Sequence, residues 1–173
     1  MISSGYRSGA WGESFTPIVA LRGAASLDGQ DDESLRPMSE VSVRTLLETS
    51  TVTIRDVRCE GSRLRSEEEC ASATQLVFPY RGVYVRNLGH DQAVAEANQV
   101  LFFNAAEGYR VSHPVPGGDA SMTVVVSEPQ LRELAPPANL RDSATLAFRE
   151  QRLRIDARAQ VLLALLRHSL CQN

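Results

Sequence analysis

Short apolar stretches separated by turn residues run from Gln75 to Val126. Apolar and polar side chains alternate along 76–80 and again along 122–126, whereas 100–103 is apolar throughout. The connections between these stretches are rich in Gly, Asn and Asp, which favour tight turns. Many short strands with turn signals between them are typical of a sandwich or a small barrel. The pattern therefore predicts a mainly β fold built on this part of the chain.

The residues before this unit follow other patterns. Residues 1–40 are rich in Gly, Ser and Asp and show no sustained period, which predicts a disordered leader. Residues 39–47 space their apolar side chains as a short helix does. The stretch 51–55 is strongly β-forming, and a slip in its alternation at Asp56 predicts a bulge.

A second helical pattern closes the chain. We expect a long helix from about Asp142 to about Leu170, with an apolar stripe at close to seven-residue spacing. The residues of this stripe that we expect to form a dimer seam are Phe148, Ile155, Leu162 and Leu166. The stripe packs either on the barrel or on the same helix of a second subunit. The predicted division is a leader over 1–40, a barrel over 41–135 and a terminal helix over 141–173.

Composition and charge limit the kinds of partner that this protein is expected to bind. The 173 residues carry a net charge of -3, which gives no general attraction to nucleic acid or to an anionic membrane. Three widely spaced cysteines predict reduced thiols rather than a disulfide framework. The longest apolar run, Val161–Leu166, is too short to cross a bilayer. We expect a cytoplasmic protein without membrane association.

The usual signatures of metal sites and catalysis are missing. A metal-binding barrel of this kind needs two histidines one residue apart on a strand, whereas His90, His113 and His168 stand alone. Cys59 and Cys70 match no zinc spacing and are interpreted as structural. The run 116–119 is read as a hairpin turn, not as a phosphate loop. We therefore predict no metal, no cofactor, no catalytic residue and no enzyme activity.

A pocket inside the barrel is the remaining candidate site. Small barrels can hold one ligand in an interior with apolar walls and a few polar groups. The residues that could line such a pocket are Tyr84, Arg86, Phe103, Tyr109 and His113. Simple core packing is the competing interpretation, above all for Phe103 and His113.

Several of these stretches resemble a known family. The matching segments are Phe78–Arg86, Asn98–Ala105, Tyr109, Ser112–Pro114, Gly117–Asp119 and the later Phe148–Leu153. Together they resemble the N-terminal domain of AraC-type transcription regulators over about residues 50–170. The resemblance implies a cupin-like double-stranded β-helix (jelly-roll barrel), followed by a helical linker and dimerisation segment.

The resemblance also implies a function. Such domains sense an effector or mediate dimerisation, while a separate C-terminal domain reads DNA. We expect a homodimer with a possible small-molecule effector, and DNA contact only through a domain absent from these residues. Two alternatives stay open: a stand-alone non-metal cupin that binds a small molecule, and a cupin-type enzyme.

Overall fold

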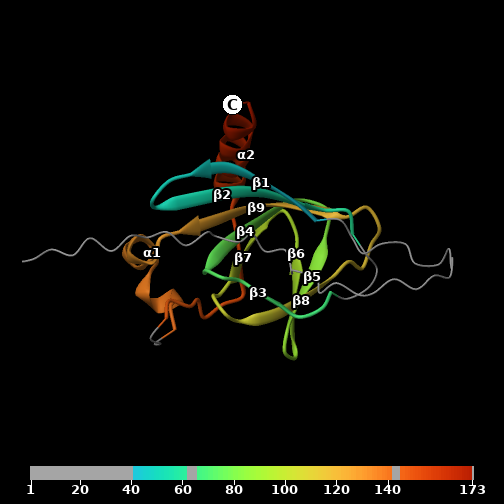
Figure 1. Cartoon of the computed structure of the whole chain (residues 1–173), viewed down its shortest axis with the longest axis horizontal. Coiled ribbons are helices and arrows are strands. Elements are labelled where there is room, and N and C mark those ends of the chain that lie inside the picture. The colour runs from blue at the N-terminus through green and yellow to red at the C-terminus, as the bar shows by residue number, and fades with distance from the viewer. Residues whose placement is uncertain (1–40, 62–65, 142–144, 173) are drawn as a thin grey trace, which may run out of the picture.

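The computed structural model describes residues 41–61, 66–141 and 145–172. The expected leader, 1–40, lies outside the described residues. Strands dominate the chain, and one long helix ends it (Figure 1). The elements are, in chain order, β1 (Val41–Glu48), β2 (Val52–Cys59), β3 (Glu69–Cys70), β4 (Gln75–Arg81), β5 (Tyr84–Leu88), β6 (Asp91–Ala95), β7 (Gln99–Phe103), β8 (Gly108–Ser112), β9 (Asp119–Val126), α1 (Glu128–Leu134), a 3-10 turn (Pro137–Asn139), β10 (Arg152–Arg154) and α2 (Ala157–Cys171).

The strands form two antiparallel sheets with the connectivity of a jelly roll. One sheet has the order β1-β2-β9-β4-β7-β10, and the other has the order β3-β8-β5-β6. Without the outer strands β1 and β10, the eight strands β2 to β9 form two sets of four, β2-β9-β4-β7 and β3-β8-β5-β6. The first and last of these eight, β2 and β9, are neighbours, as in the double Greek key of jelly rolls and cupins. The predicted fold class, a cupin-like β-barrel followed by a helix, is confirmed.

Strands β4 and β7 are covered on both faces. Val77 and Leu101 point into the barrel, where they pack in one apolar cluster, while Phe78 and Phe102 point outward into a second cluster. All five residues of β7 are buried. This explains why 100–103 reads as a continuous apolar run instead of an alternating one.

The outer cluster is completed by the segment that follows β9. Leu131 of α1 and the later Leu146 and Phe148 are buried against this face. The ring of Phe148 stacks on Phe102 with centroids 4.1 Å apart. Residues 128–141 and 145–148 therefore belong to the body of the domain.

The predicted helix over 39–47 is wrong, because residues 41–48 form the strand β1. This strand pairs with β2 from Val41↔Cys59 to Glu48↔Thr53. Pairing along the whole edge of β2 satisfies backbone groups that a helix here would leave without a sheet partner. The predicted bulge at Asp56 is also misplaced: the register shift lies in β1, between Thr45 and Leu47.

The run 116–119 does not form a hairpin. It connects β8, in the four-stranded sheet, to β9, in the six-stranded sheet. The chain therefore crosses from one face of the barrel to the other at this point. Turn chemistry at 116–119 was recognised, but local sequence does not reveal which strands a turn joins.

The terminal helix begins later than predicted. Asp156 caps it by accepting a hydrogen bond from the Ala159 amide at 2.8 Å, so α2 starts at Ala157. Just before it, β10 pairs with the edge of β7. Phe148 and Ile155 consequently lie outside the helix and pack in the outer cluster. Among the described residues, no helix combines the length and apolar character needed to cross a membrane.

Candidate functional site

The five predicted pocket residues meet in the interior of the jelly roll. Tyr84 and Arg86 extend from β5, Phe103 ends β7, Tyr109 belongs to β8, and His113 follows it. All five are buried. The rings of Phe103 and Tyr109 meet edge to face at 4.7 Å, and those of Tyr84 and His113 lie 6.5 Å apart. Strand alternation thus located these side chains, while a ligand-binding role for them stays a prediction.

Arg86 is the central polar group of this interior. Its side chain is 0% exposed, and its guanidinium lies 4.2 Å from the centroid of Phe103 and 5.8 Å from that of Tyr109. Nη1 donates to the carbonyl oxygen of Phe102 at 2.6 Å, and Nη2 pairs with Glu107 at 3.4 Å. Burial lowers the pKa of Arg86, and the charge of Glu107 opposes this effect. Stacking on rings and pairing with a carboxylate are the two ways in which a buried guanidinium is stabilised.

Side chains fill the space around Arg86. The interior cluster of buried residues is Ala71, Val77, Tyr84, Ala93, Ala95, Leu101, Phe103 and Tyr109. Leu101, with 0% exposure, and the small alanines of β6 pack against the aromatic rings. A ligand entering here would have to displace packed side chains, at a cost comparable to that of overpacking a core.

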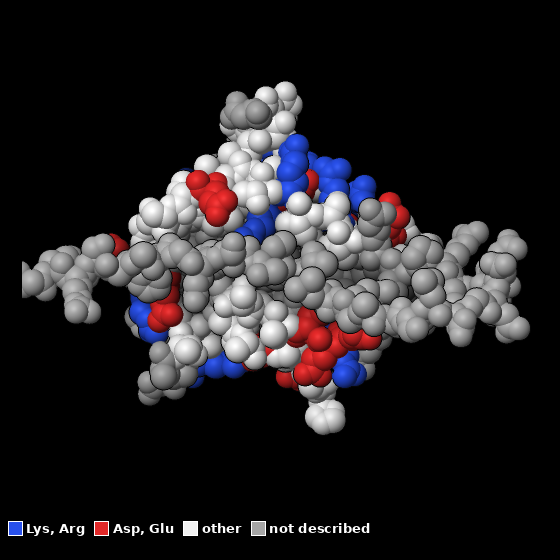
Figure 2. All heavy atoms as spheres, in the orientation of Figure 1, with Lys and Arg blue, Asp and Glu red and all other residues white. Residues whose placement is uncertain are grey.

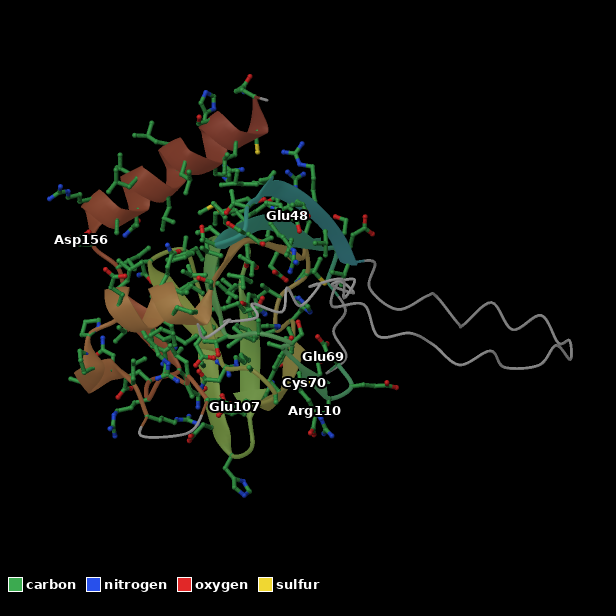
Figure 3. The ribbon with its side chains drawn as sticks, turned by 60° about the vertical axis from the view of Figure 1, so that its left-hand side comes forward. Glu48, Glu69, Cys70, Glu107, Arg110 and Asp156 are labelled. Atoms are coloured by element: carbon green, nitrogen blue, oxygen red, sulfur yellow. The ribbon has the colours of Figure 1, made fainter. Side chains whose placement is uncertain are left out.

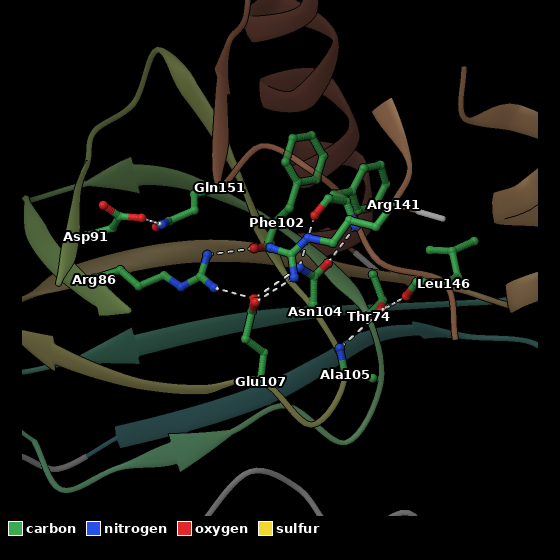
Figure 4. A network of polar contacts seen from close by, with 11 residues as sticks. Thr74, Arg86, Asp91, Phe102, Asn104, Ala105, Glu107, Arg141, Leu146 and Gln151 are labelled. Carbon is green, nitrogen blue, oxygen red and sulfur yellow. Dashed lines mark hydrogen bonds and ion pairs between the residues drawn. The ribbon is translucent and has the colours of Figure 1, made fainter. Parts of the chain in front are cut away.

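A polar network joins the interior to the segment after α1 (Figure 4). Glu107 accepts from Arg141 at 3.0 Å and from the Asn104 side-chain amide at 3.0 Å, besides pairing with Arg86. Asn104 in turn accepts from the Phe148 amide at 2.8 Å and donates to the Phe148 carbonyl at 3.2 Å. The hydroxyl of Thr74 donates to the Leu146 carbonyl at 2.9 Å. This network connects Arg141, Leu146 and Phe148 to the barrel.

A second polar group lies near the loops that connect the two sheets. His113 Nε2 and Asp119 Oδ2 are 2.6 Å apart, and both side chains are nearly inaccessible to solvent. Half-buried Cys59 completes the group, and the ligand atoms of the three residues all lie within 4.8 Å of one another. The hydrogen bond with Asp119 is the largest cause that raises the pKa of His113 to about 10. A hydrogen bond with Cys59 is the next largest, and burial opposes both.

Sequence reasoning missed this group because Cys59 is far from His113 and Asp119 in the chain. Cys59 ends β2 and Asp119 begins β9, and the two residues are direct partners in the antiparallel register. Neither Cys59 nor Asp119 has a second metal-binding residue at the short spacing that marks a metal site in a sequence. His90, in the β5–β6 turn, and His168, on α2, take no part. Only the pairing of β2 with β9 could have revealed the set.

Glycines hold the loops around this group in close contact. Gly118 has φ +66° and Gly82 has φ +71°, a region that other residues rarely adopt. A Cβ on Gly118 would collide with the carbonyl oxygen of Cys59, and one on Gly82 would collide with the carbonyl oxygen of Gly118. The three chain segments therefore touch backbone to backbone, which fixes the positions of Cys59, His113 and Asp119.

The four predicted dimer residues separate into two pairs. Phe148 and Ile155 belong to the outer cluster, whereas Leu162 and Leu166 lie on α2. Figure 3 shows α2 running from Asp156 along the outside of the body, with some side chains pointing toward the body and others away from it. Val161, Leu162 and Leu165 are 58%, 57% and 60% exposed. In Figure 2 the protruding end of α2 shows mostly uncharged atoms.

Comparison with known proteins finds remote structural likeness only. No protein-family model matches the chain, and no curated protein matches it. A cupin superfamily protein from Desulfitobacterium hafniense is 14% identical, with a TM-score of 0.42 over 53% of this chain and 83% of that one. A cupin domain from Bordetella pertussis is 12% identical, with a TM-score of 0.41 over 54% of this chain and 97% of that one. The Clostridium difficile EutQ protein is 11% identical, with a TM-score of 0.45 over 52% and 70%.

Proposed function

We propose that this chain is the regulatory part of an AraC-type transcription regulator, and that it acts by forming a homodimer through α2. The observation that carries the proposal is the exposed apolar face of α2, defined by Val161, Leu162, Leu165 and Leu166. No residue of α2 is fully buried on its own body. A helix with this much exposed aliphatic surface gains stability by covering it.

A second copy of the chain is the occupant that this face fits best. The four residues of the face are uncharged, and α2 contains no acidic residue that would have to be paired. Helix α2 contacts its own body through Arg167, whose guanidinium lies 4.1 Å from the ring centroid of Tyr80, and through Cys171, so the exposed face stays available. Two-fold pairing of identical faces closes the assembly without leaving a copy of the face uncovered.

The dimer surface must be larger than α2 alone can provide, so it includes β1. A helix of 15 residues is about 22 Å long, too short to supply alone the ~800 Å² per partner of a standard interface. Strand β1 lies beside α2, with Arg44 Nη2 3.0 Å from Cys171 Sγ, and leaves Val41 and Leu47 exposed. We therefore assign the dimer surface to α2 together with the adjoining edge strand β1.

The packed interior supports dimerisation rather than effector sensing as the main role. An effector site needs a cavity, or side chains that move aside at low cost. Here Arg86 is stacked, hydrogen-bonded and fully buried, and Leu101 of the interior cluster is also fully buried. The barrel in this proposal is a rigid support for α2.

Sedimentation velocity tests the proposal directly. The wild-type chain should be a dimer at tens of micromolar, the order expected of a specific interface. Leu165→Glu places a charge at the centre of the face and should yield monomers. Gln160→Glu adds the same charge to the same helix outside the face, and should leave the dimer intact. A wild-type monomer at these concentrations would contradict the proposal, as would equal behaviour of the two variants.

The regulatory part of the proposal has a separate test. Reading the gene beyond codon 173 shows whether a helix-turn-helix pattern follows in frame, as an AraC-type regulator requires. Such a pattern would support the proposal. A stop codon would leave a dimeric cupin-like module without the DNA-reading part and would contradict the assignment to a regulator.

A further inference from the structure

Three side chains with different donor atoms converge between the two sheets. Cys59 offers a sulfur, His113 a ring nitrogen and Asp119 a carboxylate oxygen, all within 4.8 Å of one another. They come from the end of β2, the residue after β8 and the start of β9. A zinc site with one open position takes three ligands from its protein, which is the number of donors that these three segments offer.

The donor set selects a class of metal. One thiolate, one imidazole and one carboxylate form a mixed soft and hard set, which suits Zn²⁺ and similar borderline divalent ions better than Mg²⁺ or Ca²⁺. The hard ions prefer oxygen ligands throughout. The geometry therefore indicates an ion of the Zn²⁺ type, with a fourth ligand from solvent or from a bound molecule.

The distance between His113 and Asp119 shows what binding would change. Their closest atoms are 2.6 Å apart, a hydrogen-bond distance. Two donors about 2.0 Å from one tetrahedral ion lie ~3.3 Å from each other. An ion would thus take the place of the shared proton and widen this gap by ~0.7 Å, a change within the range of side-chain rotation.

The surrounding backbone is built to hold such a group. Gly82 and Gly118 allow three segments to touch, and a side chain at either position would force them apart. Ser121, buried and two residues after Asp119 on the same face of β9, adds a hydroxyl one step further into the barrel. Tyr84 lies beside Ser121, and its ring is 6.5 Å from that of His113. These neighbours restrict the rotamers of the donors, as outer residues do in metal sites.

We propose that Cys59, His113 and Asp119 form a binding site for one Zn²⁺-type ion per chain. The site lacks the paired histidines expected of a metal-binding barrel, so a search for local motifs passes over it. Its residues lie outside α2, and Cys59 is the strand partner of Val41 in β1, so the dimer is tested separately with variants of α2.

Metal content and spectroscopy of the full chain test the site. After treatment with a chelator, loading with Zn²⁺ and desalting, the wild-type protein should retain about one equivalent. Loading with Co²⁺ should give tetrahedral visible bands and a thiolate-to-cobalt charge-transfer band in the near ultraviolet. Cys59→Ser should abolish the charge-transfer band, and Asp119→Asn should lower metal retention. Cys70→Ser, which removes an exposed thiol elsewhere, is the matched control and should change neither.

X-ray absorption on the zinc-loaded wild type decides the matter even where a variant fails to fold. One sulfur at about 2.3 Å with lighter ligands supports the site. Retention below a tenth of an equivalent, a shell of nitrogen and oxygen only, or a charge-transfer band lost in Cys70→Ser but kept in Cys59→Ser would overturn it. Sedimentation of α2 variants is unaffected by any of these results, so failure here is distinct from failure of the dimer.

Discussion

Two buried polar groups lie in the same barrel, and they are organised in opposite ways. Around Arg86 the contacts diverge: one nitrogen reaches the Phe102 carbonyl, another reaches Glu107, and the rings of Phe103 and Tyr109 lie close to the guanidinium. Around His113 the donor atoms of three residues converge within 4.8 Å. Divergent contacts connect separate parts of a structure, whereas convergent donors define a point at which something can bind.

The positions of the two groups agree with this distinction. Arg86 lies in the middle of β5, within regular hydrogen-bonded strands. His113 and its partners lie where strands end and loops begin, the usual location of functional residues on a rigid scaffold. The comparison leads us to treat the first group as structural and the second as a site, and each of the following experiments tests one side of it.

Removal of Arg86 should have the largest effect. Arg86→Ala leaves a cavity beside Phe103 and Tyr109 and removes the fully buried partner of a part-buried ion pair, so the free energy of unfolding should fall by about 3–5 kcal/mol. Denaturant titration measures this loss. Arg110→Ala breaks an exposed pair with Glu68 and should cost at most about 1 kcal/mol. Equal losses in the two variants would mean that Arg86 does not hold the interior together.

The pH dependence of stability should distinguish the second group. The pKa of His113 is about 10 in the folded chain and 6.5 ordinarily, so folding favours the protonated ring. Its contribution is complete below pH 6.5 and is lost as the pH rises towards 10. In chelator, the unfolding free energy of the wild type should therefore fall across this window relative to His113→Gln. Parallel profiles for the two proteins would contradict the assignment.

The connection between the network and the segment at Phe148 should show the smallest of the three effects. Asn104→Ala removes two hydrogen bonds to the Phe148 backbone, which should cost about 1–3 kcal/mol. Hydrogen exchange should show lost protection at the Phe148 amide, with little change at the amides of β9. Unchanged protection at Phe148 would show that the stacking on Phe102 suffices to hold this segment.

The strands of the barrel were predictable because their signal is local. Alternation along 76–80 and 122–126, with Gly and Asn between strands, gives the fold class without knowledge of which strands pair. Strand β1 was mistaken for a helix because its apolar spacing also suits a helix, and only its pairing with β2 decides the matter. The terminal helix was extended too far because Phe148 and Ile155 continue its spacing, although they are buried against the outer face of the sheet.

The two polar groups were predictable to different degrees for the same reason. Tyr84 with Arg86, and Tyr109 with His113, share strand faces that alternation reveals, so the interior residues could be identified from sequence. Cys59 and Asp119 face each other across 60 residues of chain, through a pairing that no local pattern encodes. The role of Glu107, which receives both Arg86 and Arg141, likewise depends on tertiary contacts.

The pairing of β10 with β7 connects the barrel to the segment that leads into α2. Arg86 holds the carbonyl oxygen of Phe102, while the amide of the same residue donates to the Gln151 carbonyl at 2.9 Å, five residues before the cap of α2. The Ile155 amide donates to the Asn98 carbonyl at 2.9 Å, just before the helix begins. The segment just before the helix is therefore bonded to β7, the strand that also lines the interior. A displacement of the buried guanidinium would therefore act on the backbone of Phe102 and, through this one residue, on the segment that leads into α2.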